Sequence, residues 1–427
     1  MRSVTPLTCL LLALAMLCGC GVVGVGIQVK SDKPREMAPA VPAGDVEQLT
    51  AGNSEFAWGL YQQLRGREGN LFFSPYSISA ALAMTYAGAR GETEKQMAKA
   101  LCFYLPQERL HPAFNKLDLA LASRGEGAEG REGQPFRLHI ANALWGQEGF
   151  SFLPEFLDTL AVNYGAGMRL VDYQKQPEAA RETINNWVSE ETEDKIKELI
   201  APGVIDRLTR LVLTNAIYFD AAWQDKFEKR GTEPMPFTLL DGRDVTVDMM
   251  HGKQRRGRYG EGEGWVAAEV PYQGGELAMA ILVPMEFREF EAGLDADRAR
   301  DILNQLQEVE YTLYMPKFRY ESSFSLKEAL AAMGMTDAFY AERADLSGMD
   351  GKRDRDLFVS AVVHKALVRV DEEGTEAAAA TAVVIRMGGA PGGEPLVMVV
   401  DRPFIFLIRD VKTGAILFIG RVVDPRG

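Results

Sequence analysis

Residues Glu372–Gly389 read EEGTEAAAATAVVIRMGG, and this stretch combines three conformational preferences that rarely follow one another. Four consecutive alanines behind the glutamates favour a helix, whereas TAVVI, residues 381–385, is typical of a strand. The glycine-rich end, which continues as RMGGAPGG, disfavours any regular structure. The segment as a whole therefore fits no single regular element.

The side chains of residues 375–386 alternate as a strand with one buried face requires. One set runs from Thr375 to Ile385, and every member of it is small or apolar. The other set contains both charged residues, Glu376 and Arg386, which lie ten positions apart and so share a face. No proline interrupts the run, so every backbone N–H can join a sheet. About a dozen extended residues at ~3.3 Å each span roughly 40 Å.

The composition is that of an ordinary globular protein of considerable size. The chain has 427 residues, of which 47% are hydrophobic and 25% are charged, and this balance is sufficient for a large core. The formal net charge of −13 disfavours nucleic acid as a partner and an anionic membrane surface as the main attraction. Only Cys102 lies outside the cysteine-containing N-terminus, so no internal disulfide framework is expected.

The first twenty residues resemble a bacterial lipoprotein signal. Arg2 precedes a short apolar run, and the sequence LCGC ends at Cys20. In such proteins the cysteine becomes the new N-terminus and carries lipid on its thiol, so Cys20 is the candidate lipidation site. Gly21 after this cysteine resembles proteins that are sorted to an outer membrane, where one is present. The alternative is a plain secretory signal that is cleaved after a small residue.

Residues 21–45 are rich in glycine, proline and alanine and have no sustained period, which predicts a flexible tether. A lipid anchor on this tether would be the only membrane contact of the domain that follows. We therefore expect an exported protein that is either lipid-anchored at the cell envelope or extracellular. The predicted parts are a signal peptide (1–20), a flexible tether (21–45) and a single domain (46–427).

The predicted domain has helical periodicity mainly in its first half and strands mainly in its second half. NLFFSPYSISAALAMTY predicts a strand at Asn70–Phe73 and then a buried helix that begins at Ser74–Pro75. INNWVSEETEDKIKELI, residues 184–200, predicts an amphipathic helix. RLVLTNAIYFDAAW, residues 210–223, predicts a long apolar strand in the middle of a sheet. Because strands and helices do not alternate regularly, this order predicts an α+β fold with mostly antiparallel sheets.

Motifs for catalysis or metal binding are absent from the sequence. The four histidines lack metal-ligand spacing, and the chain has no G-x-S-x-G elbow, no phosphate-binding lysine loop and no H-E-x-x-H motif. We therefore expect no metal, no cofactor and no enzymatic activity. A hydrolytic enzyme is the weakest functional hypothesis for this chain.

Two polar residues are conspicuous because they interrupt apolar strands. His364 lies within AVVHKALV, and Asn215 lies within LVLTNAIYF. Buried polar side chains without partners cost roughly 1–3 kcal/mol each, so we expect these two to bond to each other or to a nearby hydroxyl. Ser74 and Ser77 are the candidate hydroxyls. Such a cluster could be purely structural, or it could mark where two strands part.

Seven motifs, in this order, resemble those of the serpin family, and together they cover the chain from about Asp45 to Gly427. The motifs are NLFFSPYSISAALAMTYAGARGETEKQM, INNWVSEETEDKIKELI, LVLTNAIYFDAAW, MPKF, ADLSGM, VVHKALVRVDEEGTEAAAATAVV and RPFIFLI.

The resemblance implies a serpin fold with three β-sheets, eight to nine helices and an exposed C-terminal reactive loop at about residues 372–395. In inhibitory members a target protease cleaves this loop as bait and stays joined to it as an acyl-enzyme. The cleaved loop, here residues 375–386, then inserts as a central strand of the largest sheet, and the energy comes from a kinetically trapped native state. The positions that match the sheet-opening cluster are Ser74, Ser77, Asn215 and His364, and Trp223 matches the residue where insertion starts.

The start of the loop also matches the hinge of inhibitory members. Gly374 allows the backbone to turn over, and the small residues after it could slip between neighbouring strands without large groups to desolvate. A charge or proline at Thr375, Ala377 or Ala379 would block this movement. The hinge residues are Glu372, Glu373, Gly374, Thr375, Glu376, Ala377, Ala378, Ala379 and Ala380.

The bond that a protease would cleave is open among three residues. Arg386 would attract a trypsin-like protease, Met387 would suit elastase-, chymotrypsin- or subtilisin-like pockets, and Gly388 offers no side chain to recognise. We favour Met387–Gly388. The leading hypothesis is a monomeric suicide inhibitor whose partner is a serine endopeptidase held in a covalent acyl complex, with cysteine endopeptidases as a second target class. The alternative is a non-inhibitory serpin that acts as a binding or chaperone module.

Overall fold

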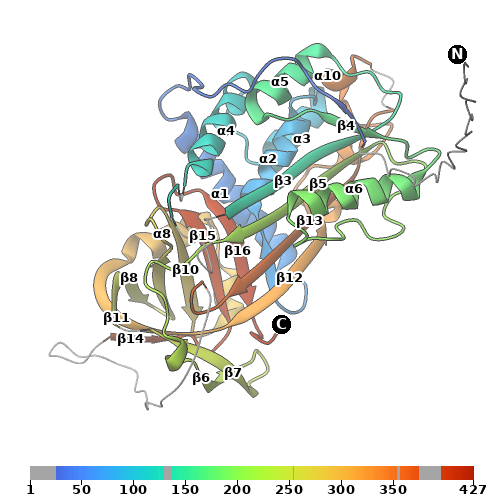
Figure 1. Ribbon diagram of the computed structural model, residues 1–427. Coiled ribbons are helices and arrows are strands. Elements are labelled where there is room, and N and C mark those ends of the chain that lie inside the picture. Colours follow the sequence, from blue (N-terminus) through green and yellow to red (C-terminus); the bar gives the residue numbers. More distant parts are fainter. Residues whose placement is uncertain (1–25, 125, 129–136, 253, 353–355, 375–395) are drawn as a thin grey trace, which may run out of the picture.

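The computed structural model describes residues 26–124, 126–128, 137–252, 254–352, 356–374 and 396–427 (Figure 1). In this part of the chain the strands form two hydrogen-bonded sheets. The first sheet has six strands in the order β1-β4-β3-β5-β13-β12. These strands are β1 (Ile27–Val29), β4 (Met168–Val171), β3 (Arg137–Gln147), β5 (Leu211–Asp220), β13 (Val359–Val370) and β12 (Phe318–Ser325).

The second sheet has ten strands in the order β2-β16-β15-β10-β9-β8-β11-β7-β6, with β14 paired to β11. We predicted three sheets, whereas the described strands form two. Strand β8 pairs with β9 along one edge and with β11 along the other, and it so joins the strands on both sides into one continuous sheet. The strands are β2 (Leu71–Phe73), β16 (Ile416–Val422), β15 (Phe404–Asp410), β10 (Leu277–Pro284), β9 (Trp265–Pro271), β8 (Arg255–Gly262), β11 (Gln307–Pro316), β7 (Asp244–His251), β6 (Glu233–Thr238) and β14 (Leu396–Val399).

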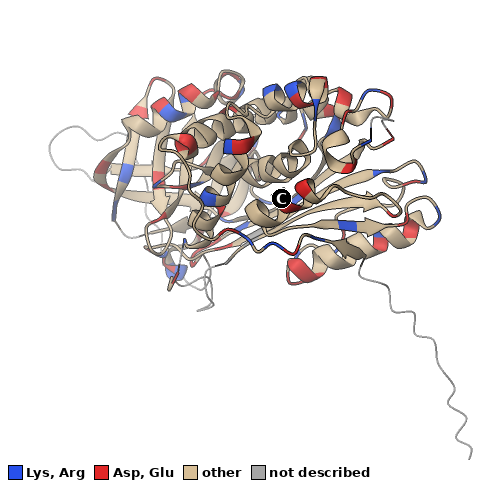
Figure 2. Ribbon diagram, turned by 90° about the horizontal axis from the view of Figure 1, so that it is seen from above, with Lys and Arg blue, Asp and Glu red and all other residues tan. Residues whose placement is uncertain are grey.

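The described residues form ten α-helices, against the eight to nine predicted, and three of them have six residues or fewer. None of these helices is long and apolar enough to cross a membrane. Figure 2 shows acidic and basic residues interspersed along them. The helices are α1 (Asp45–Leu64), α2 (Pro75–Tyr86), α3 (Gly91–Ala100), α4 (Gln107–Ala122), α5 (Pro154–Tyr164), α6 (Pro177–Glu191), α7 (Phe287–Ala292), α8 (Ala296–Gln305), α9 (Lys327–Ala332) and α10 (Ser347–Asp350).

Two local predictions illustrate how the sequence sets helix boundaries. Helix α2 begins at Pro75 as predicted, because the hydroxyl of Ser74 accepts a hydrogen bond from the amide of Ser77 and caps the first turn. The amphipathic helix predicted for residues 184–200 has other bounds in the structure, since α6 begins at Pro177 and ends at Glu191. Glu193 and Asp194 have φ values of 49° and 60°, which a right-handed helix cannot accommodate.

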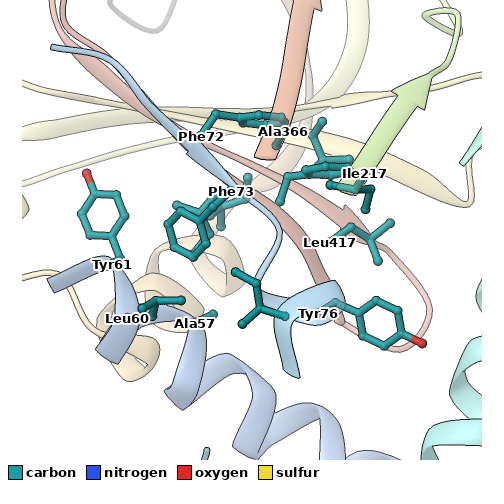
Figure 3. Close-up of a cluster of buried hydrophobic side chains, with 14 of the residues drawn as sticks. Ala57, Leu60, Tyr61, Phe72, Phe73, Tyr76, Ile217, Ala366 and Leu417 are labelled. Atoms are coloured by element: carbon teal, nitrogen blue, oxygen red, sulfur yellow. The ribbon is translucent and has the colours of Figure 1, made fainter. Parts of the chain in front are cut away.

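The six-stranded sheet is covered on both faces. Helix α6 crosses one face, where Ile184 and Val188 pack among buried side chains that include Val212 and Ala361 (Figure 1). The opposite face packs on α2 and on the second sheet. Figure 3 shows this junction, in which apolar side chains from helices and from both sheets meet. The labelled residues are Ala57, Leu60, Tyr61, Phe72, Phe73, Tyr76, Ile217, Ala366 and Leu417.

The segment predicted as a flexible tether is packed against the domain where the structure describes it. Strand β1 pairs antiparallel with β4 and so extends the edge of the six-stranded sheet. Farther along, Arg35 donates hydrogen bonds to Asn115 at 2.8 Å and to Asp118 at 2.6 Å. Strand β1 was not predicted, because three residues among glycines and prolines carry no periodic signal.

Replacing Gly167 with alanine should displace β1, because a Cβ atom at position 167 would lie 2.7 Å from the carbonyl oxygen of Val29. We expect hydrogen–deuterium exchange of residues 26–36 to become at least tenfold faster. Gly66→Ala is the matched control, since no atom lies within 4 Å of its added Cβ. Equal exchange in the wild type and both variants would show that the segment is not held by the sheet.

Candidate functional site

Strands β5 and β13 of the six-stranded sheet are parallel neighbours. Their pairing runs from Val359 opposite Leu211 to Leu367 opposite Tyr218. The pairing of β13 with β12 on its other side continues to Val370. Beyond Leu367, therefore, β13 is bonded to one neighbour and the sheet begins to divide at this end.

A row of buried and partly buried polar side chains crosses the middle of this sheet. Asn142 on β3, Asn215 on β5 and His364 on β13 are direct partners in the strand register. The Asn215 carboxamide is hydrogen-bonded to His364 on one side and to Asn142 on the other. Its Nδ2 atom also donates to the Ser77 hydroxyl at 2.5 Å. This network bonds three strands to each other and to the start of α2, at Ser77.

The environment of His364 fixes its charge and its tautomer. The backbone N–H of Ser74 donates to Nε2 of His364 at 3.3 Å, so Nε2 carries the lone pair. The proton is therefore on Nδ1, which donates to Oδ1 of Asn215. Complete burial lowers the pKa of His364 to about 3, because a charged imidazole would lose its hydration. The ring is neutral near pH 7.

The structure brings together all four residues predicted for the cluster and adds one that sequence reasoning missed. Asn142 donates to the carbonyl oxygen of Ser77 at 3.1 Å and accepts from its hydroxyl at 3.1 Å. The signal that identified Asn215, a polar residue inside an apolar strand, is also present in FRLHIANALWGQ, residues 136–147. Asn142 could have been found in the same way.

A second group of contacts holds the chain where it leaves β13. An isolated bridge between Asp371 and Gly374 closes a tight turn. The backbone N–H of Trp223 donates to the Glu373 carbonyl at 3.1 Å, and its indole N–H donates to the Asp371 carbonyl at 2.9 Å. The indole is stacked on Tyr272, with ring centroids 4.6 Å apart. The predicted residue Trp223 thus lies directly on the turn.

Both glutamates of the turn are paired. Glu372 is buried and accepts hydrogen bonds from Thr232 at 2.6 Å and Lys317 at 3.1 Å. Burial alone would raise the pKa of Glu372, but these bonds hold it below its usual value. Glu373 forms ion pairs with Lys229 at 3.2 Å and Lys226 at 3.8 Å.

Comparison with known proteins agrees with this geometry. The family model described as serpin, a serine protease inhibitor, matches residues 51–425. The human leukocyte elastase inhibitor is 41% identical over 392 residues, which cover 89% of this chain and 100% of that protein. A serpin-like protein of Thermococcus kodakarensis is 38% identical, with 93% and 90% covered.

The chain is a serpin. The solved structure of tengpin, a thermophilic serpin in its native state, matches with a TM-score of 0.78 and 29% identity over 93% of this chain and 97% of tengpin. Uncleaved ovalbumin matches with a TM-score of 0.77 and 27% identity over 88% and 100%. These matches confirm the α+β serpin fold. A family of inhibitors also agrees with the prediction that the chain is not an enzyme.

Several predicted residues of this serpin lie outside the described part of the chain. They include Cys20 and the candidate reactive-bond residues Arg386, Met387 and Gly388. The hinge is divided at Gly374, which is the last described residue before the loop. The hinge residues beyond it are Thr375, Glu376, Ala377, Ala378, Ala379 and Ala380.

The depressed pKa of His364 predicts that acid destabilises this serpin. In the unfolded chain the imidazole of His364 is protonated below its usual pKa of about 6.5, whereas in the folded chain it is protonated only below about pH 3. The free energy of unfolding should therefore fall by about 2 kcal/mol between pH 6.5 and pH 5. His111, whose pKa burial lowers to about 4, should contribute a similar loss.

Urea titrations at several pH values measure this effect. His364→Gln should remove about half of the slope between pH 6.5 and pH 5, and His111→Gln should remove the other half. An unchanged slope in His364→Gln would contradict the assignment of a neutral, buried imidazole.

Proposed function

We propose that this serpin is a suicide inhibitor of serine endopeptidases that acts by inserting residues 375–386 between β5 and β13. The observation that carries the proposal is the parallel pairing of β5 with β13, followed by a turn at the end of β13. A chain that reverses at Gly374 would run antiparallel to both strands. Insertion would replace one parallel ladder with two antiparallel ladders, which are more stable per residue.

The faces of β13 agree with the alternation of the loop. Ala366 and Val368 on one face belong to the core shared with the second sheet. Lys365 and Arg369 on the other face reach charged partners, Glu321 and Asp371, at 3.0 Å and 2.8 Å. An inserted strand has the same requirement: small or apolar residues toward the core, with Glu376 and Arg386 on the charged face.

The buried cluster supplies the barrier that such a mechanism requires. A strand can pass between β5 and β13 only when the bonds of Asn215 to His364 are broken. Each buried polar group left unpaired costs roughly 1–3 kcal/mol, so the network resists opening until insertion replaces the lost bonds. This supports a native state held by kinetics rather than by a minimum of free energy.

For the target, we propose a serine protease with an apolar specificity pocket that cleaves at Met387–Gly388. The human relative is named for inhibition of leukocyte elastase, and elastase-like pockets accept an unbranched apolar side chain such as methionine. Cleavage at Arg386 by a trypsin-like protease is the competing possibility. Mass spectrometry of the released C-terminal peptide identifies the bond.

For the location, we propose export and lipid attachment at Cys20, at the cell envelope or its outer membrane where one is present. Strand β1 starts at Ile27, which leaves six residues between Cys20 and the sheet. At ~3.5 Å per residue these span at most about 20 Å. The domain would therefore be held close to the membrane. Radioactive palmitate labelling that is lost in Cys20→Ser tests this attachment, and equal labelling of the variant would contradict it.

Two neighbouring alanines provide a matched test of insertion. Ala377→Arg places a charge in the set that must face the core, whereas Ala378→Arg places the same charge in the set that shares a face with Glu376. After incubation with pancreatic elastase or chymotrypsin, we expect the wild type and Ala378→Arg to form complexes that survive SDS. Ala377→Arg should instead be cleaved as a substrate, with at least a tenfold lower yield of complex.

Cleavage of the wild type without any SDS-resistant complex would contradict the inhibitor and favour the non-inhibitory alternative. Equal complex yields from both arginine variants would contradict insertion with this alternation, even if the protein inhibits.

A further inference from the structure

The ten-stranded sheet contains a pocket beside the first residues of β8, which pair with β11 but not yet with β9. Strand β8 pairs with β9 only from Arg258, opposite Glu269, onward. Its first residues, from Arg255, pair with β11 alone, while the end of β9 stays with β10 as far as Pro271. A pocket of about 820 Å³ occupies the resulting wedge. Its lining includes Lys226, Arg255, Gly257, Pro271 and Glu308.

Arg255 is a buried cation at this pocket. Its residue is 6% exposed, and among the described residues its guanidinium has no hydrogen bond or ion pair. Its Nε atom is completely enclosed and lacks an acceptor. The guanidinium lies 4.4 Å from the centre of the Phe227 ring, which is a cation–π contact. Burial lowers the pKa of Arg255, as expected when a charge is removed from water without a counter-ion.

A second unsatisfied donor lies beside Arg255. Tyr311 on β11 is the direct register partner of Arg255 on β8, so the two side chains share a face. The Tyr311 hydroxyl is buried and has no hydrogen-bond partner in the described chain. Burial raises the pKa of Tyr311 to about 12, which keeps the hydroxyl protonated as a donor. Two neighbouring donors are thus buried together without an acceptor, although buried polar groups are normally paired.

Gly257 provides the space for a ligand next to these donors. It lies two residues after Arg255 on the same face of β8, and an added Cβ would meet the Tyr311 ring at 3.4 Å. A larger side chain at this position would fill the volume in front of the tyrosine hydroxyl. Gly257 itself lines the pocket, which has volume for a small molecule, and Tyr311 lies next to this glycine although it is not part of the lining.

The carboxylates around the pocket do not neutralise Arg255. Glu269 is held by Arg258 at 2.5 Å and Arg409 at 2.6 Å. Glu308 is paired with Arg256 at 3.6 Å. Asp225 lines the pocket and attracts Arg255 electrostatically, but it forms no ion pair with it. Lys226 adds a further positive charge and is only loosely paired with Glu373, at 3.8 Å.

We propose that this pocket, which we name the wedge pocket, binds a small organic anion. A carboxylate or phosphate group of the ligand would accept hydrogen bonds from the guanidinium of the lining residue Arg255 and, past Gly257, from the Tyr311 hydroxyl. Such charge-assisted bonds would supply the acceptor that both donors lack. The rest of the ligand would lie along the wedge between β8 and β9, near Lys226. This binding requires neither the reactive loop nor a protease, so it is independent of the proposed inhibitory function.

Calorimetric titration of the full chain with citrate and with inorganic phosphate tests the proposal and distinguishes the two anionic groups. Sodium chloride at equal ionic strength corrects for screening. We expect saturable binding of at least one anion. Arg255→Met should weaken it at least tenfold and Tyr311→Phe severalfold. Arg300→Gln is the control, because Arg300 is exposed, paired with Asp297 and outside this pocket.

Thermal unfolding gives a second readout that does not depend on calorimetry. Without anion, Arg255→Met should melt at or above the wild-type temperature, because it removes an unpaired buried charge. The anion should raise the melting temperature of the wild type and not that of Arg255→Met. The proposal is overturned if neither anion exceeds the effect of chloride, or if Arg255→Met binds as tightly as the wild type. If Arg255→Met does not fold, undiminished binding by Tyr311→Phe overturns it.

Discussion

The bond between Asn215 and His364 joins two parallel strands, and the rest of the site is arranged around that junction. Because both side chains are buried, neither can release its partner without losing a hydrogen bond that water cannot replace. The start of α2 extends the network through Ser77, and β3 extends it through Asn142. The centre of the sheet is thus held by polar contacts, although its surroundings are apolar.

The turn at the end of β13 is held by a different set of contacts. Trp223 bonds to two carbonyl groups of the turn after β13, and Lys317 and Lys229 hold its two glutamates. Most of these contacts are backbone hydrogen bonds or partly exposed ion pairs, which break at lower cost than a buried network. A loop pulled into the sheet would therefore first part the end near Trp223 and only later meet the cluster at His364.

The sequence predicted the parts of this serpin whose signals are local. His364 and Asn215 were identified because a polar residue in an apolar strand needs a partner, and the start of α2 followed from Ser74–Pro75. Asn142 carried the same signal but was overlooked. Strand β1 was missed because its stability comes from the edge it meets. Arg255 lies in RRGR, residues 255–258, a run of charge that is typical of an exposed segment. Its burial and its position opposite Tyr311 depend on contacts between strands that are distant in the sequence.

The central claim is that the cleaved loop becomes a strand between β5 and β13, and thermal unfolding before and after cleavage tests it most directly. Cleavage within residues 375–395 by a protease that is then removed should raise the melting temperature by more than ~10 °C. About a dozen new backbone hydrogen bonds at roughly 1 kcal/mol each support a gain of that size. An unchanged or lower melting temperature would contradict insertion.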